Sequence, residues 1–316
     1  MPTLVDLSEE EINELAAQQA PQLTAEFGGE LESERIRAYV SARGQELAEV
    51  CERPELPWTF KVLDSDVVNA FALPGGHVFI TRGLLVKLEN EAELMCVLGH
   101  EIAHITLDHG EKRMEKAATA QLGVAVVAGI LSGTQDDDAV TLLGAYGTQF
   151  GLQMVQLQHS RKDESDADVL GADYAAALGY SPAGILGVLE VLASLGTDST
   201  PELLKTHPNP ERRIDDIIVM LDERYPDWEA VSGEYHRFNP ARYQAEVRDT
   251  LAQLPPASEE ALQIPENAIS VLHPVPGQEH TYHHHHHHHH GHGHGHGHHH
   301  HSHGPHSHSH GPAEQH

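Results

Sequence analysis

Basic side chains and cysteines are scarce in this sequence of 316 residues, which has 19 Lys and Arg against 48 Asp and Glu. The resulting formal charge of −29 at pH 7 excludes a general binder of nucleic acids or anionic membranes, since both need clustered basic surface. Cys51 and Cys96 are the only cysteines, so a framework of disulfides is excluded too. An apolar core or a metal ion must therefore stabilise the fold.

Long uninterrupted apolar runs are also missing. Residues 1–14 are acidic and lack the basic and apolar regions of a secretory signal. The stretch 117–135 has an apolar centre, 122–131, that is too short to cross a bilayer, and the stretch 139–158 carries several Thr and Gln side chains. We therefore expect no stable membrane span and a cytoplasmic location. The alternatives are a membrane hairpin formed by these two stretches and a location in the cell envelope.

What the sequence does contain is helical periodicity around a few short strands. Apolar residues recur at helical spacing over 9–20, 32–50, 90–109, about 112–131, 139–158, 161–178, 182–195, 209–223 and 240–254. Strand-like alternation occurs over 58–64, 69–73 and 77–81, and the last two flank Pro74-Gly75-Gly76 as a hairpin. This pattern predicts an α+β fold, mostly helical around a small β-sheet.

Composition divides the chain into four parts. Residues 1–34, with nine acidic and no basic side chains, predict an acidic N-terminal helical segment. Residues 35–254 carry the motifs described below and form the predicted main domain. Residues 255–282 are rich in proline and acid and contain no Lys or Arg, which is typical of a linker. Residues 283–316 form a tail that holds twenty of the 29 histidines.

The pentapeptide His100-Glu101-Ile102-Ala103-His104 is the most informative pattern in the chain. Asn90 and Glu93 predict the start of a helix before it, and positions four apart on a helix share a face, so both imidazoles can reach one metal ion. Glu101 lies one residue round the helix, where it can take a proton from water on the metal and return it to a leaving amine. The alternative is coincidence, with two histidines on an ordinary core helix.

A carboxylate ligand decides between these alternatives. Glu164 and Asp168 are four apart on the predicted helix over 161–178, so their side chains share a face. A zinc site with two His and one Glu needs a carboxylate ligand, and it commonly needs a second carboxylate that holds a ligand imidazole in one tautomer. Glu164 as ligand and Asp168 as the orienting group meet both needs. A solvated acidic face is the alternative for this segment alone, but the two motifs together favour a site for one catalytic Zn²⁺.

With these motifs, residues 35–225 resemble the HtpX- and BepA-type zinc metallopeptidases, relatives of the CaaX prenyl protease in the gluzincin-type peptidase family M48. The resemblance also rests on the segments 69–76 and 81–84, and on Thr206-His207-Pro208 followed by Arg213-Ile214. It implies a zincin-like metalloprotease domain with His100, His104 and Glu164 as zinc ligands and Glu101 as the catalytic base.

The resemblance implies a zinc-dependent metalloendopeptidase that hydrolyses peptide bonds of extended or misfolded proteins, with protein or peptide partners and no nucleic acid. The sequence departs from the family at Asp166, where many relatives have Glu. The membrane spans of the HtpX and prenyl-protease branches are not evident, and neither is the helical-repeat domain that follows the catalytic domain in BepA. Location is therefore not carried over from the family.

Two further parts of the chain are candidates for the reaction. The strand formed by Ala70, Phe71, Ala72 and Leu73 is predicted to offer an edge to which a substrate adds as a further strand, and the alternative is an ordinary structural hairpin. His207 is predicted to stabilise an oxyanion or to take a fourth zinc position in a resting form. The alternative for His207 is a helix cap or a bond to a carboxylate.

Three other charged or histidine side chains are interpreted as structural. Arg213 is predicted to pair with a carboxylate, with a part in the oxyanion site as the alternative. His109 and His159 are predicted to lie at helix ends and not to bind the metal.

The tail consists of a run of histidines at 283–290 followed by Gly-His, Ser-His and Gly-Pro-His units. A run of this kind invites the interpretation of an expression tag, but the irregular Gly, Ser and Pro interleaving is typical of a natural disordered tract. Closely spaced neutral imidazoles bind zinc, nickel or copper. The tail is therefore predicted to buffer or sense metal. The alternative function for the whole chain is metal storage or delivery on a zincin scaffold.

Overall fold

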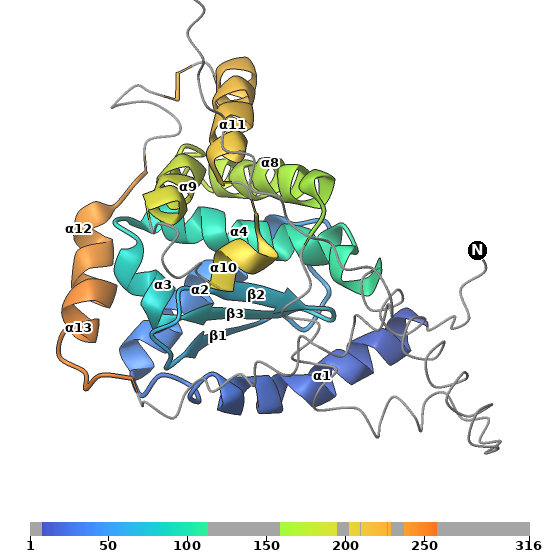
Figure 1. Ribbon diagram of the computed structural model, residues 1–316, viewed down its shortest axis with the longest axis vertical. Helices are drawn as coiled ribbons and strands as arrows, with labels where there is room; N and C mark the ends of the chain where they lie inside the picture. Colours follow the sequence, from blue (N-terminus) through green and yellow to red (C-terminus); the bar gives the residue numbers. More distant parts are fainter. Residues whose placement is uncertain are drawn as a thin grey trace, which may run out of the picture. The chain divides into compact units, whose positions relative to one another are not determined.

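The computed structural model describes residues 8–112, 159–194, 202–208, 210–225, 227–228 and 237–257 (Figure 1). Beyond Lys112, the predicted helix at about 112–131 lies outside these residues. The same holds for the predicted helix at 139–158, the predicted linker beyond residue 257 and the His-rich tail. Within the described ranges, no helix is both long enough and apolar enough to span a membrane.

Three short strands form one sheet with β3 in the middle. β1 (Thr59–Leu63) runs parallel to β3 (His77–Thr81), and β2 (Ala70–Leu73) runs antiparallel to β3. Gly75 and Gly76 turn the chain between β2 and β3 with φ angles of 82° and 94°, a region that residues with a side chain rarely adopt. The predicted hairpin and the predicted strand before it are confirmed, with ends within one residue of the prediction.

The central helix α4 (Glu91–Thr106) carries the His-Glu-x-x-His motif. It begins as predicted, because Asn90 accepts a hydrogen bond from the backbone N–H of Glu93 at 3.0 Å. All of its residues from Glu91 to Ile105 are buried. A helix that is buried all round lies inside the molecule, so the motif faces the interior and not the solvent.

The helix α8 (Arg161–Ala177) crosses α4 at close range. A capping box starts α8, with Ser160 accepting from the N–H of Asp163 at 3.2 Å. A Cβ atom on Gly99 of α4 would lie 2.8 Å from the carbonyl oxygen of Gly171 of α8, and a Cβ on Gly171 would lie 2.6 Å from the backbone nitrogen of His100. Because both positions lack a side chain, the two backbones approach closely and the acidic face of α8 meets the histidines of α4.

The other described helices extend the predicted pattern. They are α1 (Glu9–Glu26), α2 (Glu34–Val50), α3 (Arg82–Lys87), α9 (Gly184–Ser194), α10 (Glu202–Thr206), α11 (Pro210–Arg224), α12 (Pro240–Tyr243) and α13 (Asp249–Leu251), with a π-helical turn, η1 (Gln244–Arg248), between the last two. The sequence does not predict α3 and α10, because one or two turns are too short to show a helical period.

The first helix is longer than predicted and contains Pro21. Its apolar face continues past the proline through Leu23 to Phe27, and these side chains pack on Phe71 and Phe79 of the sheet. Tertiary packing of an apolar face contributes more to helix stability than the hydrogen bond that a proline removes. The helix therefore continues to Glu26, although the sequence pattern predicts an end at residue 20.

Both faces of the sheet are covered by helices (Figure 1). The α1 side forms one apolar cluster with Phe71 and Phe79, whereas Val78 and Ile80 point into a larger cluster with residues of α2 and α4. This alternation follows from the period of two in a β-strand. The predicted α+β class, mostly helical with a small sheet, is confirmed for the described residues.

Candidate metal centre

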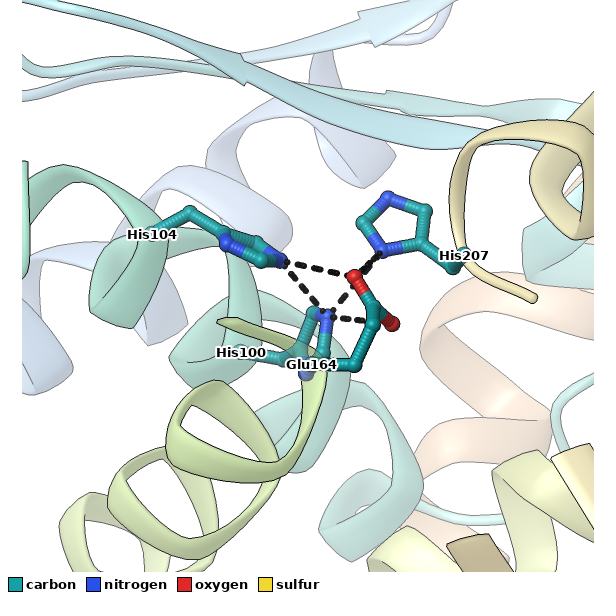
Figure 2. A group of neighbouring side chains, drawn as sticks. All are labelled: His100, His104, Glu164 and His207. Carbon is teal, nitrogen blue, oxygen red and sulfur yellow. Dashed lines mark hydrogen bonds and ion pairs between the residues drawn. The ribbon is translucent and has the colours of Figure 1, made fainter. Parts of the chain in front are cut away.

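Four side chains converge beside α4 (Figure 2): two from α4, one from α8 and one from the residue that follows α10. His100 and His104 direct their Nε2 atoms to one point, at a separation of 3.0 Å. Oε1 of Glu164 from α8 lies 3.5 Å from Nε2 of His104. Nδ1 of His207 lies 2.9 Å from the same Glu164 oxygen and 3.2 Å from Nε2 of His100. All four side chains are buried, and their candidate ligand atoms lie within 4.8 Å of one another.

The short helix α10 places His207. The backbone N–H of His207 donates to the carbonyl of Leu203 at 2.7 Å, which extends the helical hydrogen bonding by one residue. The carbonyl of Thr206 accepts from the N–H of His159 at 3.0 Å, and this bond connects α10 to the segment just before α8. His207 is thus held on the side of the cluster opposite the His100–His104 face, as Figure 2 shows.

The outer ring nitrogens of both motif histidines already have partners. Nδ1 of His100 lies 3.0 Å from Oδ1 of Asp168, and Nδ1 of His104 lies 2.9 Å from Nδ1 of His109. If each Nδ1 carries the proton, the two Nε2 lone pairs face each other at 3.0 Å, which is repulsive unless a cation lies between them. Two imidazole nitrogens and a carboxylate oxygen are ligands that Zn²⁺ prefers. The residues present therefore fit a zinc ion.

The charge states of Glu164 and His104 also suit a metal. Burial opposes ionisation of Glu164, but the neighbouring His207 and Arg213 outweigh burial and hold the pKa of Glu164 well below its usual range. Burial lowers the pKa of His104 well below that of a free imidazole, and the nearby His100 lowers it further. An ionised carboxylate and a neutral imidazole are the forms that bind a metal ion.

Arg213 of α11 neutralises the carboxylates on the far side of the cluster. Its Nε and Nη2 donate to the two oxygens of Asp168 at 2.7 and 2.6 Å, and its Nη1 lies 2.7 Å from Oε2 of Glu164. Burial opposes ionisation of Asp168, but the charge of Arg213 outweighs it and lowers the pKa of Asp168. The expected pairing of Arg213 with a carboxylate is present, and it connects α11 to α8.

Glu101 of the motif helix lines a pocket beside the ligand cluster. The pocket is lined by Glu101, His104 and His207, together with the β2 residues Phe71, Ala72 and Leu73. Glu101 is 2% exposed, and its Oε1 lies 3.7 Å from Nε2 of His207. The carboxylate of Glu101 thus lies beside the ligand cluster and not within it, as the spacing of the motif requires.

The β2 strand lies at an edge of the sheet and beside the motif helix. Among the described strands it pairs with β3 alone, and it packs against α4. Ala70, Phe71 and Leu73 are buried, and Ala72 is partly buried. The structure thus brings the predicted strand edge to the same pocket as Glu101.

The sequence analysis interpreted His109 and His159 as structural histidines and did not predict that both contact His104 of the cluster. His109 follows a turn in which Asp108 has a φ of 56°, and this turn brings the His109 ring back against His104. The ring of His159 stacks on His104 with 3.8 Å between ring centroids. The signal for His109 was its position just beyond the C-terminus of the motif helix. In a continued helix with 3.6 residues per turn, His109 would lie on a different face from His100 and His104. It reaches His104 because the helix ends before it.

Comparisons with known proteins agree with this picture. The sequence model of peptidase family M48 matches residues 34–220, more than half of the chain. The chain is 30% identical over 203 residues to a beta-barrel assembly-enhancing protease of Yersinia pestis, covering 63% of this chain and 42% of that protein. It is 32% identical over 158 residues to the mitochondrial metalloendopeptidase OMA1 of Arabidopsis thaliana, covering 50% and 30%. The chain thus spans less than half the length of these curated relatives.

Proposed function

The chain belongs to peptidase family M48, and from this premise we propose that it is a zinc-dependent metalloendopeptidase acting on extended or misfolded proteins. The observation that carries the proposal is the convergence of His100, His104 and Glu164 on one point, with Glu101 next to them. We assign this activity to a zincin-like peptidase domain at residues 35–254.

In the proposed mechanism, His100 and His104 would hold a zinc ion through Nε2, and Glu164 would hold it through a carboxylate oxygen. Asp168 keeps His100 in the tautomer with a free Nε2. A bound ion would supply Lewis acidity for the scissile carbonyl and for the attacking water. Glu101 accepts the proton of the attacking water on its carboxylate and delivers it to the leaving amine. The burial of these side chains keeps bulk water away from the proton.

The substrate would bind along β2. An extended peptide that pairs with the edge of Ala70–Leu73 gains backbone hydrogen bonds, which do not depend on its side chains. Binding of this kind gives broad sequence preference and requires an unfolded segment. Both properties suit an enzyme that cleaves misfolded proteins.

Casein, which lacks a stable fold, tests the proposed activity. We expect the full chain to cleave casein, to lose this activity when a chelator removes the metal, and to regain it when zinc is added back. Cleavage that persists after the metal has been shown to be gone would contradict a zinc peptidase. Absence of cleavage by protein shown to hold zinc at its buried centre would do so as well.

His207 is proposed to take the fourth zinc position in a resting form, because its Nδ1 lies within hydrogen-bonding distance of Glu164 and His100. We expect His207→Ala to weaken zinc binding while casein turnover at saturating zinc is largely retained. A fall in turnover of about 10²-fold with unchanged zinc affinity would instead favour the oxyanion role. If both quantities are unchanged, neither role holds. Zinc competition with a chromogenic chelator and initial rates measure the two quantities.

The histidine-rich tail is proposed to collect metal and pass it to the buried centre. The support is its composition, since closely spaced imidazoles bind zinc, nickel and copper. The same casein assay tests this with a chain lacking residues 283–316. We expect the shortened chain, once stripped of metal, to regain activity more slowly at limiting zinc. Identical rates of recovery for the two chains would remove this role from the tail.

A further inference from the structure

We propose that His109 is a positioning residue that holds the zinc ligand His104 in its metal-binding tautomer, and that Asp163 holds His109 in turn. The proposal deepens the proposed function and rests on its metal centre. It gives a role to a buried histidine that the spacing of the ligand motif does not include.

The first step is the bond between the two imidazoles. Nδ1 of His104 lies 2.9 Å from Nδ1 of His109, while Nε2 of His104 faces His100 and Glu164. A neutral imidazole has one N–H and one lone-pair nitrogen. If Nε2 of His104 is to offer its lone pair to a metal, the proton must be on Nδ1. His104 then donates this proton to the hydrogen bond, and Nδ1 of His109 accepts it.

The second step follows from the tautomer of His109. Because its Nδ1 accepts, its own proton lies on Nε2, which is 3.5 Å from Oδ1 of Asp163. The other oxygen of Asp163 accepts from the backbone N–H of Ser160 at 3.1 Å, as part of the capping box of α8. The start of α8 therefore fixes the carboxylate that faces His109. His109 is 6% exposed and His104 is 2% exposed, so little water competes for the bond between the two imidazoles, whereas the Asp163 side chain is 30% exposed.

The arrangement on His104 parallels the one on His100. Asp168 contacts Nδ1 of His100 directly at 3.0 Å, whereas Asp163 reaches Nδ1 of His104 through His109. Both carboxylates belong to α8 and flank the proposed ligand Glu164. One helix thus supplies a metal ligand and the groups that orient both imidazoles. Figure 2 shows the remaining ring nitrogen of His104 directed away from the other three side chains.

The same histidines do not make a second metal site while the first is occupied. Nitrogen atoms of His104, His109 and His159 lie within 4.8 Å of one another. An ion among them would need the lone pair of Nδ1 of His104, which carries the proton when Nε2 binds the first ion. We therefore assign His109 to orientation and His159 to packing, since its ring stacks on His104.

The experiment compares zinc affinity in full-length variants by competition with a chromogenic chelator. A full-length His104→Ala variant, which keeps the tail, measures the metal bound outside the centre, and this background is subtracted. We expect His109→Ala to weaken zinc binding at the centre by about 10- to 100-fold. His109→Asn, whose side-chain oxygen replaces Nδ1 as acceptor, should restore most of the affinity. The spectrum of bound Co²⁺ should change in His109→Ala and return in His109→Asn.

The matched control is His159→Phe, which keeps a ring stacked on His104. We expect its zinc affinity to equal that of the wild type. If His159→Phe weakens zinc binding as much as His109→Ala, or if His109→Asn gives no rescue, packing and not the hydrogen bond is responsible and the inference is wrong.

If His109→Ala does not fold, the zinc affinities of the His109→Asn and Asp163→Asn variants decide. Unchanged zinc affinity in Asp163→Asn removes the role of Asp163. If the wild-type chain binds no more zinc in total than His104→Ala, the buried centre binds none and the proposed function itself is wrong.

Discussion

Glu101→Gln is expected to bind zinc as tightly as the wild type and to cleave casein more slowly by on the order of 10²- to 10⁴-fold. Glutamine has the size of glutamate but cannot take up a proton from the attacking water. The carboxylate of Glu101 lies beside the ligand cluster, 3.7 Å from His207, so its replacement removes no metal ligand. Initial rates at saturating zinc and a zinc competition titration measure the two quantities.

Glu93→Gln is the matched control, because Glu93 is another buried glutamate of α4, 5% exposed. It accepts hydrogen bonds from the backbone of Glu89 and the side chain of Asn90 at the start of the helix. The same substitution there should leave casein cleavage unchanged. Substantial cleavage by Glu101→Gln would exclude Glu101 as the base. Loss of zinc from Glu101→Gln would mean that Glu101 supports the metal site instead.

The geometry of the His-Glu-x-x-His motif was predictable because it is local. The cap at Asn90 and the spacing of His100 and His104 are properties of one helix, and the structure reproduces both. Glu164 and Asp168 share a helix face for the same reason. The hairpin was equally local, since Gly75 and Gly76 supply the positive φ angles that its turn requires.

The contacts around the motif were not predictable, because they depend on how distant segments meet. The α4–α8 crossing requires the absence of side chains at Gly99 and Gly171, and no local pattern indicates that these two glycines face each other. His109 reaches His104 only because the chain turns at Asp108. The order of motifs along the chain predicts a metal site, but the contacts that the proposed ligands make with His109 and Asp168 follow from packing.

The cluster of buried carboxylates also explains how a bound cation could stabilise this very acidic chain. Glu101, Glu164 and Asp168 are each buried near the convergence point, and Arg213 pairs with the last two. Buried charges are stable when each is paired and hydrogen bonded. A divalent ion between His100 and His104 would add positive charge where the structure places lone pairs and carboxylates. Metal binding should therefore stabilise the folded chain, by an amount that rises with the logarithm of the ratio of free metal concentration to Kd.

Glu91→Ala is expected to lower the free energy of unfolding by about 3–5 kcal/mol, because it removes one partner of a buried ion pair. Glu91 is 0% exposed and is the first residue of α4. It accepts from Tyr39 and Arg43 of α2 at 2.9 Å each, and from Asn239 at the start of α12. Its loss leaves Arg43 buried without this partner and disconnects three helices. Urea unfolding of the zinc-loaded proteins measures the difference.

The effect should depend on pH in a defined direction. Burial opposes ionisation of Glu91, but hydrogen bonds from Asn239, Arg43 and Tyr39 outweigh it and lower its pKa in the folded chain. A lowered folded pKa means that the stabilisation is complete above the unfolded value, about 4.3, and is lost as the pH falls through the folded value. The difference between wild type and Glu91→Ala should thus be largest near neutral pH and shrink in acid.

Glu89→Ala provides the control, since Glu89 is an exposed glutamate two residues before Glu91. A substitution at an exposed site away from buried pairs should change stability by less than about 0.5 kcal/mol. If Glu91→Ala is no more destabilising than Glu89→Ala, the buried contacts of Glu91 do not hold α2, α4 and α12 together. If the difference between wild type and Glu91→Ala persists unchanged at acid pH, the carboxylate charge is not its source. Lost packing would then explain the effect, because the alanine side chain fills less of the space between the helices.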